Sequence, residues 1–436
     1  MITTTFAVIA VFVVAFGLIS KWLEKTVLTP PIIFVSFGLL LSPQLLGLIT
    51  VEAKTSIIKI LAELTLILIL FIDASRINFK LLRQQYNLPL RLLAIGFPIT
   101  IILGTIWGLI IFSGELNLWE AAVLATILAP TDAALAQAVV SSTRVPVCIR
   151  QAINVESGLN DGIGLPFLLI FLSLAGISES SQNTIFWLTF ILEQILLGPV
   201  IGVAIGYLGG WLISFSSSKQ LMNESFENLS VLALPLIAYS LAEIIGGNGF
   251  IASFCAGLIV GNTAKFLCNY IHNFGDAEGQ LLILLTFMSY GETMVFPALS
   301  QVNWQLILYA ITSLMVTRMA GVSISLMGTR LKTETVCFLG WFGPRGVASI
   351  IYGLLLLEEA KVAGKELIFS TMVVTVLMST FAHGLTSIPF TKRYAKAFES
   401  LETESDVPEL VSVPEMRVRS PLKSDHHTEV RKGSKH

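Results

Sequence analysis

Long apolar blocks, separated by short polar or charged breaks, run along the chain to about residue 390. A helix needs about 20 mostly apolar residues to cross a bilayer, and by this criterion the blocks predict about thirteen membrane-spanning helices. The predicted helices are 5–22, 30–49, 55–74, 89–113, 118–141, 148–176, 184–214, 228–246, 249–268, 279–299, 304–328, 335–357 and 367–390. The pattern therefore predicts an all-α polytopic membrane protein, with a transmembrane domain over 1–390 and a polar, mobile tail over 391–436.

The composition favours the same class. Hydrophobic residues make up 54% of the 436 residues and charged residues only 13%, which is about half the charged share of a soluble domain. The net charge of −2 provides no basic footprint for nucleic acid. The four cysteines lack the spacing of a zinc, haem or iron–sulfur site, and no phosphate-binding loop for a nucleotide is present. We therefore expect a lipid bilayer as the surroundings, no cofactor, and no nucleic-acid or nucleotide partner.

Lys and Arg are unevenly distributed over the predicted loops. If the N-terminus lies outside, the inner loops carry most of these residues, and the outer loops carry only Lys54, Lys59, Lys361 and Lys365. Positive charge is retained on the cytoplasmic side of membrane proteins. The bias predicts an outer N-terminus, an odd number of spans and a cytoplasmic C-terminus. The membrane that we expect is the inner (plasma) membrane of the cell, which the charge bias itself does not identify.

Two predicted helices carry helix breakers at their centres. Pro130 lies in Ala-Pro-Thr-Asp at 129–132 of the fifth helix, and Pro344 lies in Phe-Gly-Pro-Arg-Gly at 342–346 of the twelfth. Proline removes a backbone donor and frees a carbonyl, which a membrane protein tolerates only inside protein or beside a water-filled cavity. The fifth and twelfth predicted helices are seven apart in the order of spans. Because successive spans alternate in direction, an odd separation means that these two cross the membrane in opposite directions. This arrangement indicates inverted repeats over about 5–176 and 228–390, joined by a linking helix over about 184–214. Paired breaks point to a transporter site; the alternative is two unrelated kinks.

Charged residues inside the predicted helices need a physical explanation, because each costs roughly 2.5–3.5 kcal/mol at the bilayer centre. Four acids face only two bases, which favours a site for cations or protons. Glu156 is the expected counter-charge of one or both arginines, as a structural brace whose disruption would cost about 3–5 kcal/mol. The six residues are Asp73, Asp132, Glu156, Asp161, Arg318 and Arg345.

The sixth predicted helix concentrates polar residues over 154–162. Residues four apart share a helix face, so Ser157 and Asp161 face one way, and Glu156 and Asn160 lie on an adjacent face about 100° away. The first face presents a hydroxyl and a carboxylate to an ion. The second presents a carboxylate to an arginine and an amide to unwound backbone.

The oxygen atoms of this region suit a hard cation. We expect a freed carbonyl near Pro130 to complete the set offered by the Asp161 carboxylate and the Ser157 hydroxyl, with Asp132 within reach through a water molecule. Gly158 and Gly162 are expected to let a neighbouring helix approach closely. A carboxylate that binds Na⁺ also binds H⁺, so the two ions compete for one charge, as an antiporter requires.

The motifs at 129–132, 156–162 (Glu-Ser-Gly-Leu-Asn-Asp-Gly) and 342–346 together resemble those of the cation/proton antiporter-1 family, the bacterial NhaP-type Na⁺/H⁺ antiporters. They occur in the same order and with similar spacing, and the resemblance covers about residues 1–390. It implies a secondary antiporter, not an enzyme. It also implies a homodimer with the NhaA-like antiporter fold, in which the two broken helices cross.

The resemblance also implies the roles of single residues. Asp161 would bind the cation or the proton, Thr131 would contribute through its main chain, Ser157 through its hydroxyl and Asp132 through water. Asp73 stands where relatives commonly place an acid, often glutamate. A direct ligand, an acid of the entrance funnel or an ion-paired surface acid all fit this position. Asn160 before Asp161 resembles the electroneutral branch, which exchanges one cation for one proton; Pro130, Pro344, Glu156, Arg345 and Arg318 would support the site.

Other functions remain open at this stage. Na⁺, Li⁺ and K⁺ are all possible cations, so a K⁺/H⁺ exchanger is one alternative. A cation channel is another, although no filter-like run of carbonyl-presenting residues is present. A membrane-embedded enzyme could use two acids on two helices, but the neighbouring Arg345 and the prolines favour transport.

Overall fold

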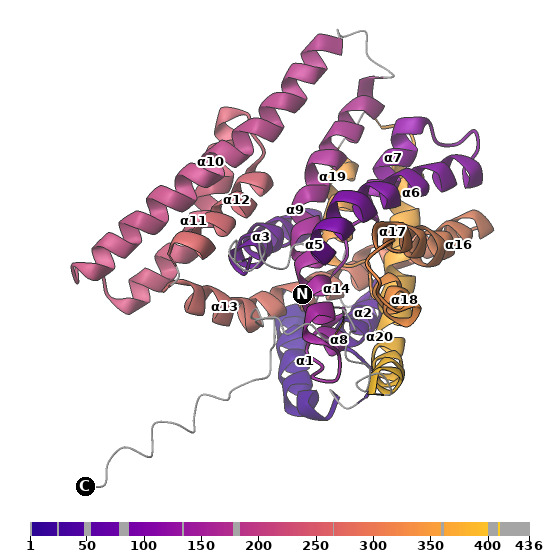
Figure 1. The fold of residues 1–436 in the computed structure, drawn as a ribbon, viewed down its shortest axis with the longest axis horizontal. Coiled ribbons are helices and arrows are strands. Elements are labelled where there is room, and N and C mark those ends of the chain that lie inside the picture. Colours follow the sequence, from indigo (N-terminus) through magenta and orange to yellow (C-terminus); the bar gives the residue numbers. More distant parts are fainter. Residues whose placement is uncertain are drawn as a thin grey trace.

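The computed structural model describes residues 2–23, 26–47, 54–77, 87–132, 135–177, 184–264, 266–358, 362–399 and Glu409. Within these ranges the regular elements are all helices (Figure 1). They are α1 (Ile2–Leu23), α2 (Pro30–Leu41), α3 (Lys54–Ser75), α5 (Asn87–Arg91), η2 (Leu92–Gly96), α6 (Phe97–Ile111), α7 (Leu118–Ile127), α8 (Gln137–Val140), α9 (Val147–Ile177), α10 (Thr184–Ser218), α11 (Glu224–Ile245), α12 (Gly249–Thr263), α13 (Cys268–Asp276), α14 (Glu278–Thr293), α15 (Val295–Leu299), α16 (Trp304–Ile311), η3 (Thr312–Thr317), α17 (Arg318–Ser325), α18 (Thr333–Trp341), α19 (Val347–Glu358) and α20 (Lys365–Glu399).

Every predicted membrane-spanning range overlaps one of these helices or an interrupted series of them. The predicted breaks are present: α7 ends before Pro130, and α18 and α19 are separated by 342–346. Two features were not predicted. The π-helical turns η2 and η3 interrupt the fourth and eleventh ranges, and the short α13 lies between the ninth and tenth.

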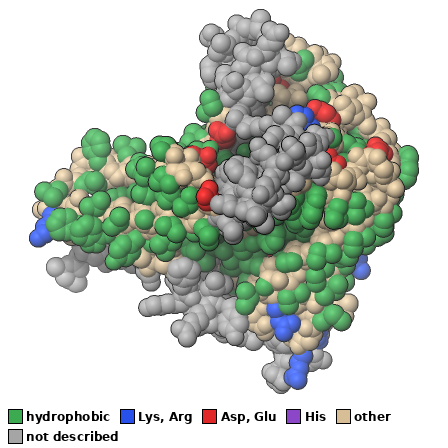
Figure 2. All heavy atoms as spheres, turned by 90° about the horizontal axis from the view of Figure 1, so that it is seen from above, with side chains coloured by type: hydrophobic (Ala, Val, Ile, Leu, Met, Phe, Trp, Pro, Cys, Tyr) green, Lys and Arg blue, Asp and Glu red, His purple; other side chains and the backbone are tan. Residues whose placement is uncertain are grey.

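Within the part of the chain that the structure describes, six helices are long and apolar enough to cross a membrane: Asn87–Ile111, Val147–Gly176, Leu196–Ser218, Ser225–Ile245, Trp304–Ser325 and Lys365–Ala397. Large hydrophobic side chains are exposed along α10, including Leu196, Val200 and Trp211. Figure 2 shows hydrophobic side chains over most of the described surface in that view, with Lys and Arg mainly near its edges. This distribution matches a protein whose solvent is lipid, since water would not stabilise so large an apolar surface. The protein is therefore a multi-pass integral membrane protein.

Close helix packing places α3 next to the centre of the protein. Helices α10, α11 and α12 pack together on one side (Figure 1), and α12 packs on α3. The α12–α3 contact is close because Gly257 faces the Phe71 carbonyl, where any side chain would overlap the backbone. In turn, α3 contacts α9, α14 and α19. These four helices surround the break in the fifth predicted helix.

The last helix, α20, extends beyond its predicted end at 390 and continues to Glu399. The ring of Tyr394 in this extension stacks on Phe338 with 4.2 Å between ring centroids. Glu409 is also buried, and its Oε1 accepts hydrogen bonds from the Lys332 amide (2.8 Å) and the Thr335 hydroxyl (2.9 Å) at the start of α18. The rest of the predicted tail, 400–408 and 410–436, lies outside the described residues.

Candidate functional site

A small cavity lies where α3, α9, α14, α19 and the break after α7 meet. The atom-free space there, including the open space that adjoins it, is about 370 Å³. The polar residues that line it are Asp73, Asp132, Ser157 and Asp161, and the apolar ones are Leu66, Ile69, Ile283, Val347 and Ala348. Three of the four acids predicted to lie inside the membrane thus surround one cavity with largely apolar walls.

The predicted division of α9 into two polar faces is confirmed. Ser157 and Asp161 line the cavity, whereas Glu156 points to a buried ion pair with Arg318. The pair is bidentate: Arg318 Nη1 donates to Glu156 Oε1, and Nη2 donates to Oε2 over 2.8 Å. Glu156 therefore belongs to a brace between α9 and α17 and does not line the cavity.

Asn160 differs from its expected contact. Its Nδ2 donates to the Thr131 hydroxyl over 2.8 Å, so the expectation that this amide bonds unwound backbone is wrong. The hydroxyl oxygens of Thr131 and Ser157 lie 3.0 Å apart, within hydrogen-bond distance. A chain of polar contacts thus runs from Asn160 through Thr131 to Ser157 and joins α9 to the break.

Arg345 donates hydrogen bonds to backbone carbonyls at the break in the fifth predicted helix. Its Nη1 donates to the carbonyl oxygens of Ala129 and Pro130, the second over 3.2 Å. The expectation that a freed carbonyl near Pro130 serves an ion is therefore wrong for these two groups, because a guanidinium already lies on them and would repel a cation. Glu156 likewise pairs with Arg318 and not with Arg345 in the hydrogen bonds of this site.

Asp132 ties the two broken helices together in both directions. Its backbone amide donates to the Pro344 carbonyl over 2.8 Å, and its Oδ2 accepts from the Val347 amide over 2.9 Å. Val347 is the first residue of α19, so the carboxylate lies at the positive end of that helix dipole. Gly346 leaves room for this contact, since a methyl group there would overlap the carboxylate.

The glycines of the sixth predicted helix have different neighbours. A methyl group at Gly162 would lie 2.6 Å from the Phe254 ring, so α12 does approach closely there. A methyl group at Gly158 would lie 3.8 Å from the Asp73 Cβ, an ordinary contact. The expectation of a close helix approach is therefore confirmed for Gly162 and wrong for Gly158.

Replacing Asp132 tests its contact with α19. Asp132→Asn keeps an acceptor for the Val347 amide but removes a charge worth up to about 2 kcal/mol in a partly buried helix terminus. Asp132→Ala also removes the capping hydrogen bond, typically worth about 0.5–2 kcal/mol. We expect the unfolding temperature in detergent to fall from wild type to the Asn variant and further to the Ala variant. An Ala variant as stable as the wild type would contradict the capping role.

Two contacts in this region were not expected from the sequence. The Tyr352 hydroxyl donates to the backbone carbonyl of Asp161, and the Ser379 hydroxyl accepts from the Arg345 amide over 2.7 Å. A tyrosine in an apolar helix is a weak signal for such a contact, because a buried hydroxyl needs a partner. Nothing local indicates which partner it takes.

Comparisons with known proteins show the family of the chain. Residues 5–393 match the family described as sodium/hydrogen exchanger, transmembrane. The chain belongs to the sodium/hydrogen exchanger family. The cavity, the two breaks and the ion pair all lie within the part of the chain that matches this exchanger family.

Individual exchangers are more distant. The K⁺/H⁺ antiporter NhaP of Alkalimonas amylolytica is 25% identical over 82% of this chain and 61% of its own length. A probable Na⁺/H⁺ antiporter of Schizosaccharomyces pombe is 28% identical over 57% of this chain and 34% of its own. The chain thus spans less than two thirds of these curated relatives.

The fold resembles that of a solved exchanger. A structure of the sodium proton antiporter MjNhaP1 from Methanocaldococcus jannaschii at pH 8 has a TM-score of 0.71 and 21% identity, and the match covers 88% of this chain and 99% of that one. A second structure of the same antiporter gives a TM-score of 0.73 at 20% identity. At this identity the likeness establishes the fold alone.

Proposed function

We propose that the protein is a secondary monovalent cation/proton antiporter, in which cation and proton compete for Asp161. The observation that carries this proposal is the cavity where Asp161, Asp132, Asp73 and Ser157 meet at the crossing of two broken helices. Family membership supports it, and curated members are named Na⁺/H⁺ and K⁺/H⁺ antiporters. The proposal is a transporter, not an enzyme.

The exchange follows from the cost of an unpaired charge. An empty Asp161 carboxylate is an anion, and moving it past apolar walls is costly. Binding either one cation or one proton neutralises it. If only the neutral, loaded site passes between the two sides of the membrane, each outward cation is coupled to an inward proton or the reverse. Asn160 adds no carboxylate next to Asp161, and Asp161 is the one acid proposed to exchange a cation for a proton, so we propose an electroneutral 1:1 exchange.

We propose that the cation is bound by Asp161, Ser157, Asp73 and the main chain of Thr131, with Asp132 acting through water. The side chains of Asp161, Ser157, Asp73 and Asp132 all line the cavity. Thr131 is held beside Ser157 by the contacts described above. Carboxylate, hydroxyl and carbonyl oxygens are the ligands that hard cations prefer.

A second group of residues supports this site without touching the ion. Asn160 orients Thr131, the Glu156–Arg318 pair braces α9, and Arg345 stabilises the break at Pro130. Pro344, whose carbonyl accepts from the Asp132 amide, supports the crossing from the other break.

The proposed assembly has thirteen membrane-spanning helices in an NhaA-like arrangement. Its two inverted six-helix repeats, about 5–176 and 228–390, are joined by the linking helix over 184–214. We propose a homodimer in the inner or plasma membrane, with the N-terminus outside and the C-terminus in the cytoplasm. The opposite placement of the two breaks and the bias of Lys and Arg along the chain support this orientation.

Purified protein in acid-loaded liposomes tests the proposed exchange. Addition of Na⁺, Li⁺ or K⁺ outside is expected to alkalinise the lumen, whereas choline is not, and the order of the rates defines the selectivity. Clamping the membrane potential at zero with valinomycin and equal K⁺ is expected to leave the Na⁺-driven rate unchanged if the exchange is electroneutral. Folded, inserted protein that gives no flux with any of the three cations would refute the proposal.

A further inference from the structure

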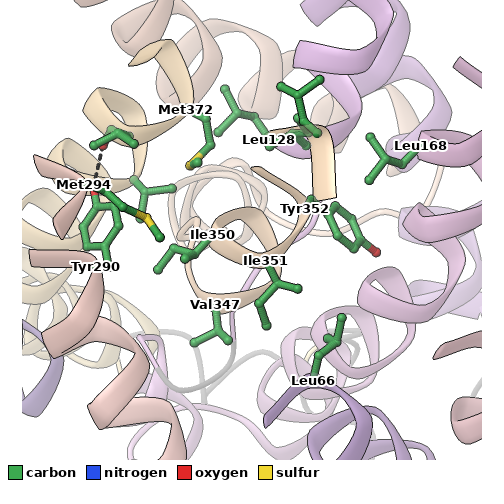
Figure 3. Close-up of a cluster of buried hydrophobic side chains, with 14 of the residues drawn as sticks. Leu66, Leu128, Leu168, Tyr290, Met294, Val347, Ile350, Ile351, Tyr352 and Met372 are labelled. Atoms are coloured by element: carbon green, nitrogen blue, oxygen red, sulfur yellow. Dashed lines mark hydrogen bonds between the residues drawn. The ribbon is translucent and has the colours of Figure 1, made fainter. Parts of the chain in front are cut away.

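Tyr352 is a buried tyrosine that contacts the main chain of the central acid. Its side chain is completely buried in α19, and its hydroxyl donates to the Asp161 carbonyl within α9. Figure 3 shows the ring extending from α19 towards the α9 side, where Leu168 lies, and away from Tyr290. The residue does not line the cavity, so its contact is with the backbone that carries Asp161.

The contact joins the two acids through one short helix. Val347, the first residue of α19, donates its amide to the Asp132 carboxylate over 2.9 Å. Tyr352 follows five positions later, about 7.5 Å along the helix axis. The same rigid turn and a half therefore holds Asp132 at its start and Asp161 at its end, with the cavity wall between them formed by Val347 and Ala348.

Neighbouring residues leave little space around the Tyr352 hydroxyl. A methyl group placed on Gly164 would lie 3.4 Å from the Tyr352 hydroxyl and 3.2 Å from the Pro130 ring. The phenol thus fits between α9 and the break after α7, in a space that glycine leaves open. The ring is fully buried and its neighbours include apolar side chains. Losing the hydrogen bond to the Asp161 carbonyl would therefore leave a buried hydroxyl unsatisfied, which lowers the stability of the folded state.

We propose that Tyr352 is a positioning residue for cation binding, which holds Asp161 at a fixed spacing from Asp132. This inference rests on the proposed function. A cation needs several oxygens at matched distances, whereas a proton needs only one carboxylate oxygen. Loosening Asp161 therefore weakens cation binding more than it weakens protonation of the carboxylate. The steps that follow binding involve a site that is already loaded, so their rates are expected to change little.

Tyr352→Phe tests the proposal because it removes one oxygen and keeps the ring. The apparent KM for the cation is expected to rise about fivefold to tenfold, the equivalent of one buried hydrogen bond, with the maximal rate per folded molecule within about twofold of wild type. A role confined to stability would lower the amount of folded protein and leave KM unchanged.

Tyr290→Phe is the matched control. Tyr290 is also fully buried, and its hydroxyl also donates to a backbone carbonyl, that of Val373. It does not line the cavity that holds the two acids, and Figure 3 shows it on the other side of α19 from Tyr352. This variant is expected to lose similar stability but to keep the wild-type KM. An unchanged KM in Tyr352→Phe, or an equal rise in both variants, would overturn the proposal.

A binding measurement separates this inference from the proposed function. Na⁺ is expected to raise the unfolding temperature of the detergent-solubilised wild type relative to choline, because a ligand that binds only the folded state stabilises it. Tyr352→Phe is expected to need about fivefold to tenfold more Na⁺ for the same shift. If the wild type exchanges ions and the Tyr352→Phe variant needs no more Na⁺ than the wild type, the inference about Tyr352 is refuted but the proposed function stands. If the wild type shows no exchange, the proposed function is refuted.

Discussion

Asp161→Asn is expected to reduce cation-driven proton flux at least 100-fold, to the level of protein-free liposomes. The amide has almost the same shape as the carboxylate, but it carries no charge to neutralise a cation and takes up no proton in the physiological range. Because Asp161 is partly buried at an apolar-walled cavity, losing its charge is expected to leave the unfolding temperature unchanged or higher. Flux and thermal unfolding would be measured on the same preparation.

Asp73→Asn is the graded comparison, since Asp73 lines the same cavity from α3. This variant is expected to retain exchange with a raised cation KM, because the central carboxylate remains. Normal transport by folded Asp161→Asn would disprove the assignment of Asp161. Equal and complete loss in both variants would indicate that the two acids act as one unit and not as a central acid with a supporting ligand.

Features set by local chemistry could be predicted from the sequence. Ser157 and Asp161 lie on one face because helical period alone separates them from Glu156, and the prolines at 130 and 344 mark both breaks because proline cannot continue the backbone ladder. Each of these conclusions needs only residues within one helix. The structure confirms them for that reason.

Features that depend on how helices cross could not be predicted. The sequence offers two arginines to Glu156, and only the fold, which places Arg318 beside it, decides for Arg318. Arg345 goes instead to the carbonyls at the break, a partner that carries no formal charge and therefore has no signal in a count of acids and bases. The π-helical turn η3 ends immediately before Arg318, and no residue in the sequence marks it.

Glu156→Gln is expected to act on stability and not on the cation. The variant leaves Arg318 buried without its counter-charge, and breaking such a pair typically costs about 3–5 kcal/mol. We expect the unfolding temperature to fall by roughly 5 °C or more and the yield of folded protein to drop. Because Glu156 is not among the residues that line the cavity, the molecules that remain folded are expected to keep the wild-type KM for the cation within about threefold. Arg318→Gln is expected to behave alike, since it strands the carboxylate on the other side of the same pair.

The double variant Glu156→Leu/Arg318→Met distinguishes a brace from a functional acid. Replacing both partners of a buried ion pair with apolar residues of similar volume is often neutral or stabilising, because no charge then remains desolvated. We therefore expect the double variant to recover most of the unfolding temperature lost by either single variant, and to recover exchange with it. Recovered stability without recovered exchange would mean that the charge of Glu156 is needed in the transport cycle itself. In that case the separation between the two faces of α9 would hold for the geometry but not for the mechanism.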